Sequence, residues 1–264
     1  MTTHRNTFRA LALALAGALF AACDKNTVQE LPFEPLLSTR VKFFNFGVNA
    51  PQVNFYADQQ KMTAVQSGTG SEATTGVAYG SVGNGNAYSQ LAAGAYTLTG
   101  RIAATTDKDL PIATVNATIA DGKYYSFYMS GFYNTTTKTV DAFVVEDPVT
   151  PPADYSVAYV RLVNTISNAT HPLILYAQYT TGDTTRFDTL TAGVPYQGVT
   201  TFATIPTGVY NLFARYQDST ANKISRTGVS LLGGHLYTVG TRGDITITST
   251  TATNRPFLDN TTNW

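Results

Sequence analysis

The sequence has one cysteine, three histidines and few charged residues, and each of these shortages excludes something. An intramolecular disulfide needs two cysteines, so none can form, and stability must come from hydrophobic cores. Charged residues are 13% of the chain and the formal net charge is zero. A protein that neutralises phosphates needs a basic stripe, which this sequence lacks. We therefore expect no nucleic-acid partner.

The sequence also lacks the motifs of the common enzyme and cofactor classes. It has no Gly-x-Ser-x-Gly elbow, no P-loop and no dinucleotide fingerprint. His4, His171 and His235 are not at metal-ligand spacing with one another or with the cysteine. The pair in Asp107-Lys-Asp109 lacks the further ligands of a calcium loop. We expect no enzymatic activity, no cofactor and no metal site.

The N-terminus has the pattern of a secretory signal. Arg5 and Arg9 supply a positive region, and the apolar run Ala10–Ala22 is too short to span a bilayer as a helix. The following stretch, Leu19-Phe-Ala-Ala-Cys23, resembles a bacterial lipobox, in which the cysteine is acylated and becomes the mature N-terminus. Phe20 departs from that pattern, because Leu is usual at its position.

We interpret residues 1–22 as a signal peptide, Cys23 as the lipidated residue and residues 23–37 as a tether. This interpretation places the protein in the cell envelope, periplasmic or at the outer membrane or cell surface, with the membrane as a partner through the lipid on Cys23. The alternative is an ordinary secretory signal that carries an incidental cysteine.

The rest of the composition favours strands. The chain has 16 tyrosines and 14 phenylalanines, many threonines, and no long segment of helical apolar spacing after Ala22. In Tyr96–Ile102 and in Tyr210–Gln217 apolar residues alternate with polar ones, as in a half-buried strand. Many such short segments between Gly, Pro and Asn turns indicate a sandwich or a barrel.

The chain is duplicated, because five segments occur twice in the same order. The matched segments are Val41–Asn45 and Val160–Asn164, Val53–Ala57 and Leu173–Ala177, Gly76–Tyr79 and Gly193–Tyr196, Ala93–Leu98 and Thr207–Leu212, and Gly122–Tyr125 and Gly234–Tyr237. Small insertions in surface loops explain why the offset between the copies changes along the chain.

A proline-rich stretch separates the two copies. Residues 148–154 contain three prolines, which cannot donate to a sheet and favour an extended link. We therefore predict an all-β protein with two tandem Ig-like β-sandwich domains, residues 38–147 and 155–264. Each domain is expected to bury its own core and to fold alone.

The repeated segments resemble the DUF4397 domain, a family of unknown function found in secreted and lipid-anchored bacterial proteins. The matching residues are Asn45, Ala50, Pro51 and Tyr79 in the first copy, and Asn164, Pro172, Tyr196, Pro206, Gly208, Tyr210, Gly234, Tyr237, Thr238 and Val239 in the second. Ala92 and His171 depart from the pattern, and the resemblance spans residues 40–243 as two tandem copies. It implies an Ig-like sandwich and no particular activity.

One tyrosine-rich strand of the first copy carries a candidate binding face. If its alternate residues face the core, Tyr124 and Tyr128 point outward, and Tyr133 lies near the end of the same segment. An exposed aromatic face can stack on a sugar or on a partner protein. The second copy has Leu236 and Gly240 at the first two positions. The alternative is that these aromatics are buried against the other domain or under a loop.

Three functions remain open. The favoured one is a non-enzymatic cell-envelope lipoprotein that acts as a binding or spacer module with an envelope protein or a glycan as its partner. The second is a glycan-binding accessory lipoprotein that uses the exposed aromatic face. The third, least favoured, is a hydrolase with an unrecognised site.

Overall fold

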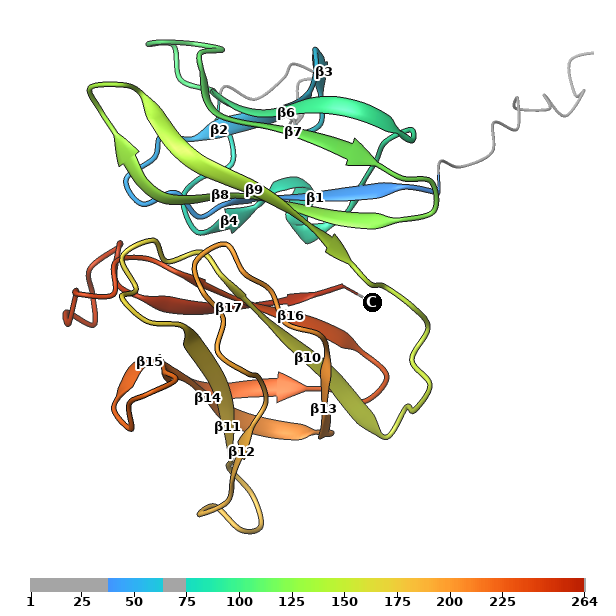
Figure 1. Cartoon of the computed structure of the whole chain (residues 1–264), viewed down its shortest axis with the longest axis vertical. Helices are drawn as coiled ribbons and strands as arrows, with labels where there is room; N and C mark the ends of the chain where they lie inside the picture. Colours follow the sequence, from blue (N-terminus) through green and yellow to red (C-terminus); the bar gives the residue numbers. More distant parts are fainter. Residues whose placement is uncertain (1–37, 64–74, 264) are drawn as a thin grey trace, which may run out of the picture. The chain divides into compact units, whose positions relative to one another are not determined.

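The computed structural model describes residues 38–63 and 75–263 (Figure 1). The predictions for the signal peptide, for Cys23 and for the tether lie outside the described residues. The described residues belong to one compact unit. Within the described residues, no helix has both the length and the apolar character needed to cross a membrane.

The first half of this unit is a sandwich of two sheets (Figure 1). Its strands are β1 (Arg40–Asn45), β2 (Val53–Ala57), β3 (Gln60–Lys61), β4 (Ser81–Val82), β5 (Ser89–Gln90), β6 (Gly94–Ile102), β7 (Pro111–Ile119), β8 (Tyr124–Asn134) and β9 (Thr139–Asp147), and a short 3-10 helix η2 (Gly83–Asn86) follows β4. One sheet has the order β4-β1-β8-β9, with β5 also paired to β1, and the other has the order β3-β2-β6-β7. Phe43 and Phe55 join the two sheets in the core, with ring centroids 5.2 Å apart.

The second half repeats this arrangement. Its strands are β10 (Val157–Asn164), β11 (Leu173–Tyr179), β12 (Phe187–Thr189), β13 (Ala203–Pro206), β14 (Gly208–Tyr216), β15 (Asn222–Leu231), β16 (Leu236–Arg242) and β17 (Phe257–Thr262). The sheets have the orders β13-β10-β16-β17 and β12-β11-β14-β15. Leu162 and Val239 of the first sheet share a core with Leu175 and Leu212 of the second. The predicted all-β sandwich fold is confirmed.

The two sandwiches also agree in strand register and in side-chain hydrogen bonds. In each half the opening strand pairs in parallel with a late strand, and the same polar side chains hold the same turns. In the register, Val41 lies opposite Tyr125, and Val160 lies opposite Tyr237. Asn45 Nδ2 donates to Val77 O, and Asn164 Nδ2 donates to Val194 O in the same way. Tyr96 OH donates to Ala92 O, and Tyr210 OH donates to Pro206 O. The motifs common to both copies therefore serve the fold.

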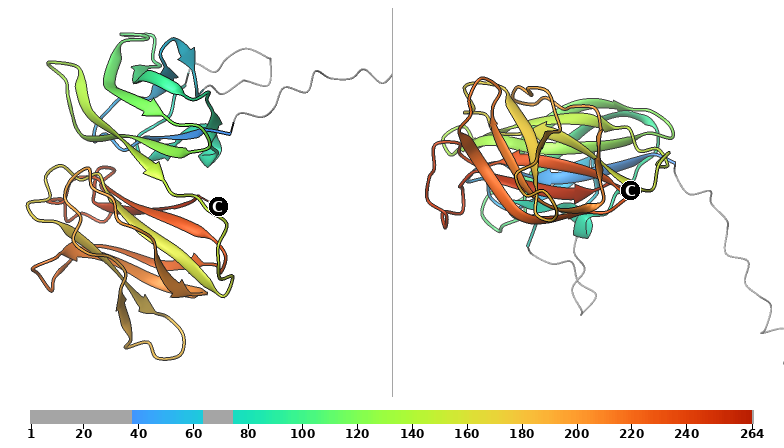
Figure 2. Two further views of the ribbon diagram at one scale, coloured as in Figure 1. Left: turned by 45° about the vertical axis from the view of Figure 1, so that its right-hand side comes forward. Right: turned by 90° about the horizontal axis from the view of Figure 1, so that it is seen from below.

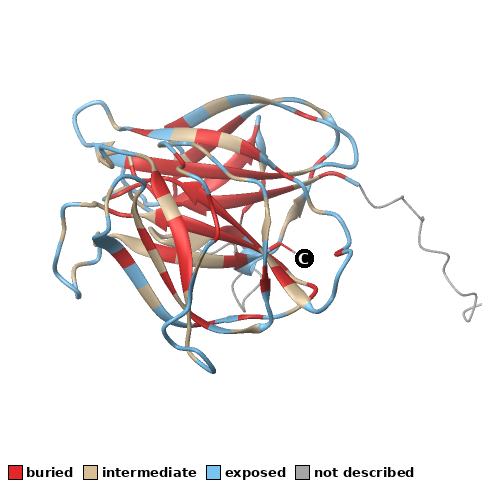
Figure 3. Ribbon diagram, turned by 60° about the horizontal axis from the view of Figure 1, so that its bottom comes forward, coloured by how far each residue is buried: buried red, intermediate tan, exposed pale blue. Residues whose placement is uncertain are grey.

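A third buried cluster contains residues from both sandwiches. It consists of Phe44, Phe46, Tyr128, Phe143 and Val145 from the first and Val163 from the second. Because side chains alternate along a strand, these residues point away from the core of their own sandwich. Figure 2 gives two further views of the strands, and Figure 3 shows that the buried residues run along them. Each sandwich has its own core, as a half that folds alone would need. Independent folding of each half stays a prediction.

Buried charges accompany this aromatic cluster. Lys42 and Arg161 are each 1% exposed and Asp147 is 2% exposed. The Arg161 guanidinium pairs with one carboxylate oxygen of Asp147, while Tyr88 OH and Ser126 Oγ donate to the other at 2.8 and 2.7 Å. Burial lowers the pKa of Lys42 to about 8, an effect that the nearby Asp147 opposes. The Asp147 carboxylate thus offsets the positive charge of two buried side chains, Lys42 on the first sandwich and Arg161 on the second.

Candidate functional site

The predicted binding face is only partly exposed, because Tyr128 is fully buried. Its ring stacks between Phe44 and Phe143, at centroid distances of 4.3 and 5.2 Å. The expectation that Tyr128 points into solvent is therefore wrong. Tyr128 is instead buried in the cluster that also contains Val163 of the second sandwich, in agreement with the alternative of burial against the other domain.

The second sandwich makes room for these aromatics with a glycine. A Cβ built on Gly240 would lie 2.9 Å from the Phe46 ring, which is closer than side-chain carbons approach. Gly240 occupies the position of Tyr128 in the other copy, as its pairing with Val163 shows. The glycine at the position that matches Tyr128 therefore lets the two sandwiches pack together.

The other two tyrosines of the predicted face lie apart from each other on β8. Tyr124 is half-buried at the start of the strand, edge-on to Tyr88 at 5.2 Å. Tyr133 is half-buried near the strand's end and packs against the core of the first sandwich. The structure does not bring Tyr124, Tyr128 and Tyr133 together on one exposed surface.

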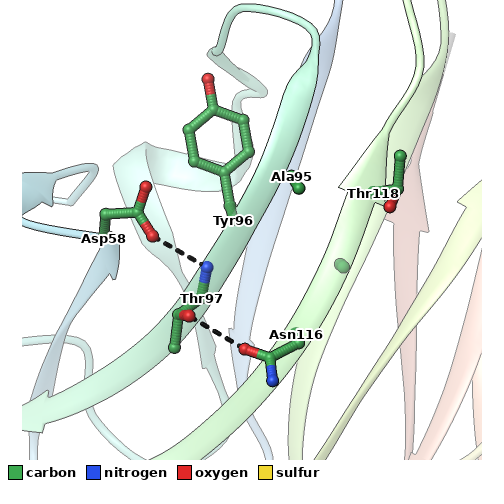
Figure 4. Close-up of a pocket in the computed structure, with 7 residues that line it drawn as sticks. Asp58, Ala95, Tyr96, Thr97, Asn116 and Thr118 are labelled. Atoms are coloured by element: carbon green, nitrogen blue, oxygen red, sulfur yellow. Dashed lines mark hydrogen bonds between the residues drawn. The ribbon is translucent and has the colours of Figure 1, made fainter.

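In the first sandwich, the outer face of the second sheet is exposed and polar around Thr97 on β6 and Asn116 on β7. A hollow of about 280 Å³ lies there, over β6 and β7 (Figure 4). Asp58 accepts a hydrogen bond from the Thr97 amide, and the Thr97 hydroxyl donates to Asn116, both at 2.9 Å. These polar groups already satisfy one another, which makes the hollow a weak candidate for a ligand.

The matching face of the second sandwich is aromatic. Tyr176 on β11 lies directly opposite Phe213 on β14, with centroids 5.2 Å apart and planes inclined by 20°. Phe187 on β12 lies 5.9 Å from Tyr176 and 6.4 Å from Phe213. Phe187 is 52% exposed, and Tyr176 beneath it is 6% exposed. We call Tyr176, Phe187 and Phe213 the aromatic patch.

Polar groups surround the aromatic patch. Arg215 lies with its guanidinium carbon 4.7 Å from the centre of the Tyr176 ring. The Tyr176 hydroxyl donates to Asn222, and burial raises its pKa, so it stays a neutral donor at physiological pH. Further along the same face Asn211 Nδ2 donates to Gln178 Oε1 at 3.3 Å. Apolar rings beside amide and guanidinium groups suit a ligand that has both apolar and polar faces.

The first sandwich keeps part of this arrangement. Tyr56 and Arg101 repeat the tyrosine–arginine contact, with the guanidinium carbon 4.3 Å from the ring centre. Thr99 lies opposite Tyr56, however, where Phe213 lies opposite Tyr176. The tyrosine–arginine pair therefore belongs to the repeated fold, whereas the additional phenylalanines are found on the second sandwich.

A longer hairpin presents Phe187. Two residues, Asp58 and Gln59, join β2 to β3, whereas residues 180–186 join β11 to β12. This longer hairpin extends away from the rest of its sheet (Figure 1). Arg186 lies 4.4 Å from the Tyr179 ring, and the Tyr179 hydroxyl donates to Asp188 at 2.7 Å. These contacts fix the hairpin immediately beside Phe187.

The predicted binding face does not include the aromatic patch, although the sequence carries a signal for Phe213. In the alternation of Tyr210–Gln217, Phe213 occupies a position on the polar face. A large apolar residue there is the pattern expected of a surface contact. For Phe187 no comparable signal exists, because its strand β12 (Phe187–Thr189) has three residues and is too short to show a strand period. No group of three His, Cys, Asp or Glu side chains in the described part of the chain could hold a metal ion.

The sequence profile of one family, described as a domain of unknown function (DUF4397), matches residues 39–176. The match covers the first sandwich, the proline-rich stretch and the strands β10 and β11 up to Tyr176. The matched segment extends past the domain boundary predicted at residues 148–154, and the profile matches the chain once. No curated protein matches the chain.

Several solved structures share features with the chain at low similarity. A leucine-rich repeat protein from Bacteroides thetaiotaomicron is 12% identical with a TM-score of 0.23, and the match covers 78% of this chain and 26% of that one. The CBM26 module of Eubacterium rectale Amy13K, solved with maltoheptaose, is 11% identical with a TM-score of 0.26 and coverages of 85% and 95%. A proposed cell adhesion protein from Bacteroides fragilis is 10% identical with a TM-score of 0.23 and coverages of 85% and 96%.

The chain thus spans about a quarter of the length of the leucine-rich repeat protein. TM-scores of 0.23 to 0.26 are too low for any of these structures to bear on the function of this chain.

Proposed function

The chain belongs to the DUF4397 family, whose function is unknown, and from that premise we propose that it is a non-enzymatic binding module whose aromatic patch contacts the ligand. The observation that carries the proposal is the exposure of Phe187, at 52%, in contact with two further rings. Aromatic residues grouped on a surface are the usual anchors of binding energy. An aromatic group on the open face of a rigid sheet is also well placed to meet a ligand without rearrangement.

A saccharide chain fits this surface best. A sugar ring has an apolar face of C–H groups, which packs on an aromatic ring, and a rim of hydroxyls, which hydrogen-bond to amides and guanidinium groups. Phe187 and Phe213 supply the rings, while Gln178, Asn211 and Arg215 supply polar groups on the same face. A purely apolar partner would cover the charged Arg215 guanidinium without offering it a hydrogen bond, at a cost of about 1–3 kcal/mol.

The second sandwich is proposed to be a second copy of the family domain that has acquired the binding role. The shared register and hydrogen bonds of the two sandwiches support a common origin. The phenylalanines and the longer β11–β12 connection set the second sandwich apart. Added loops commonly carry function, because a rigid scaffold tolerates them.

The first sandwich is proposed to act as a rigid spacer. Its cluster with Val163 and the pairing of Asp147 with Arg161 hold it against the second sandwich. If Cys23 is lipidated in the cell envelope, the first sandwich separates the aromatic patch from the membrane surface. The binding and spacer roles would then be divided between the two halves of the chain.

We expect the double substitution Phe187→Ser and Phe213→Ser to raise the Kd for a bound neutral oligosaccharide at least about tenfold, because stacking on both rings is lost. Binding is measured by isothermal titration after a panel of neutral oligosaccharides has identified one that the unmodified protein binds. The matched control is Phe132→Ser, since Phe132 is 41% exposed on the other sandwich. An unchanged Kd in a folded double variant would place the ligand elsewhere.

We also expect Cys23 to carry acyl chains on its thiol and on its new amino group. Two or more chains give stable membrane attachment, whereas one chain gives only marginal binding. Mass spectrometry of the N-terminal peptide from native membranes measures the acyl masses directly. Cys23→Ser should release the protein from the membrane fraction, whereas a free thiol on an unmodified Cys23 would contradict the assignment.

A further inference from the structure

A groove of about 640 Å³ lies on the second sandwich, between β15 and the loop that joins β16 to β17. Lys223 and Arg255 line it from opposite walls, and the aromatic rings of Tyr216 and Phe257 lie beside them. None of the residues that line the groove is an aspartate or a glutamate. Both ionised groups on its walls are therefore cationic.

The basic character extends beneath the groove. Arg226, Arg242 and Arg255 each place the guanidinium carbon within 5.4 Å of the centre of the Phe257 ring. Within the described residues, the one ion pair made by these three arginines joins Arg242 to Asp259, at 2.5 Å. Three positive charges and one negative charge thus surround a single ring, which leaves the site with an excess of positive charge.

Hydroxyl groups line part of the groove, beside apolar side chains such as Ile224 and Ile247. Thr248 and Thr250 on the loop and Ser225 on β15 are exposed and face the groove from its two sides. A hydroxyl can both donate and accept a hydrogen bond, so these side chains suit the hydroxyls and ring oxygens of a sugar. The groove therefore combines charge of one sign with neutral polar and apolar groups, in a protein whose net charge is zero.

The loop that forms one wall is held in place by a hydrogen bond between its ends and by another from Asn168. Asp244 N donates to Asn254 O at 2.8 Å, and Asn168 Nδ2 donates to the Asp244 carboxylate at 2.7 Å. Gly243 has a φ of +105°, and a Cβ there would lie 2.2 Å from Arg255 O, so the close approach of the loop ends requires glycine. The wall is thus preorganised.

The loop is also an addition to the repeated fold. β8 ends at Asn134 and β9 begins at Thr139, so four residues join them in the first sandwich. β16 ends at Arg242 and β17 begins at Phe257, so fourteen residues join the matching strands in the second. Because this longer loop forms a wall of the groove, the groove lies in the same half of the chain as the aromatic patch.

One residue connects the groove to the aromatic patch. Asn222 lines the groove, and its side-chain oxygen accepts the hydrogen bond from the Tyr176 hydroxyl. We propose that the groove binds the anionic group of an acidic saccharide whose neighbouring sugar rings lie on the aromatic patch. Lys223 and Arg255 pair with the anionic group, and the exposed hydroxyls bind the sugar that bears it. This inference names the ligand class of the proposed function and rests on it.

The test compares a uronic-acid oligosaccharide, a sulfated oligosaccharide and the neutral oligosaccharide of the same length. We expect the unmodified protein to bind an acidic form at least about tenfold more tightly than the neutral form at low salt, because two charge-assisted contacts are added. The preference should shrink as salt is raised towards 1 M. Whichever acidic form binds more tightly identifies the anionic group as carboxylate or sulfate.

The deciding variant is Lys223→Gln with Arg255→Gln, and Lys223→Gln alone is measured beside it in case the loop depends on Arg255. Lys138→Gln removes an exposed charge on the first sandwich and controls for net charge. Loss of the acidic preference with neutral binding retained supports the inference. Equal acidic and neutral binding by the unmodified protein overturns it while leaving the proposed function intact. Acidic binding that survives both groove variants also overturns it, and failure of all three saccharides to bind overturns both proposals.

Discussion

Asp147→Asn is expected to lower the free energy of unfolding by about 3–5 kcal/mol, the range found when one partner of a buried ion pair is removed. The amide has nearly the shape of the carboxylate, so packing changes little. Arg161 and Lys42 would remain buried without a compensating charge. Equilibrium unfolding in denaturant, followed by circular dichroism, measures the loss.

A neighbouring residue provides the control for this prediction. Glu146→Gln removes a carboxylate that pairs with Lys123 at 2.9 Å, where the two side chains are 46% and 54% exposed. Exposed pairs contribute about 0–1 kcal/mol, so this variant should unfold almost as the unmodified protein does. Adding Arg161→Met to Asp147→Asn should restore part of the loss, because it removes one uncompensated charge. Equal stability of the Asp147 and Glu146 variants would mean that water reaches Asp147.

The fold was predictable because each strand carries its own signal. In Val41–Asn45 and Val160–Asn164 the alternation of apolar and polar residues fixes which side chains enter the core, and the repeat doubles the signal. Alternation cannot say what covers the outer face of a sheet. Lys42 and Arg161 point away from their own cores as expected, yet both are buried.

The candidate site was less predictable, for a related reason. Tyr128 and Phe213 are both aromatic residues on the outer face of a strand, and the local sequence gives them the same appearance. Tyr128 lies in a sheet that the other sandwich covers, whereas Phe213 lies in a sheet whose outer face is exposed. Which sheet is covered depends on contacts between residues far apart in the chain, which no local pattern records.

This difference leads to a second large effect. Tyr128→Ala should lower the free energy of unfolding by about 3–5 kcal/mol, as expected when a large buried aromatic side chain is removed. The ring is 0% exposed and stacks on both Phe44 and Phe143, so its removal leaves a cavity that neither neighbour can fill. The midpoint of denaturant unfolding measures this loss.

Tyr124→Ala on the same strand is the matched control. Tyr124 is half-buried and its ring meets Tyr88 edge-on, so the expected loss is about 1 kcal/mol, near the centre of the distribution for single substitutions. Binding by the aromatic patch should survive the Tyr124 substitution, because Tyr124 belongs to the other sandwich. If Tyr128→Ala instead unfolded like Tyr124→Ala while reducing ligand binding, the outer face of β8 would be the binding surface, and the two sandwiches would not cover it in solution.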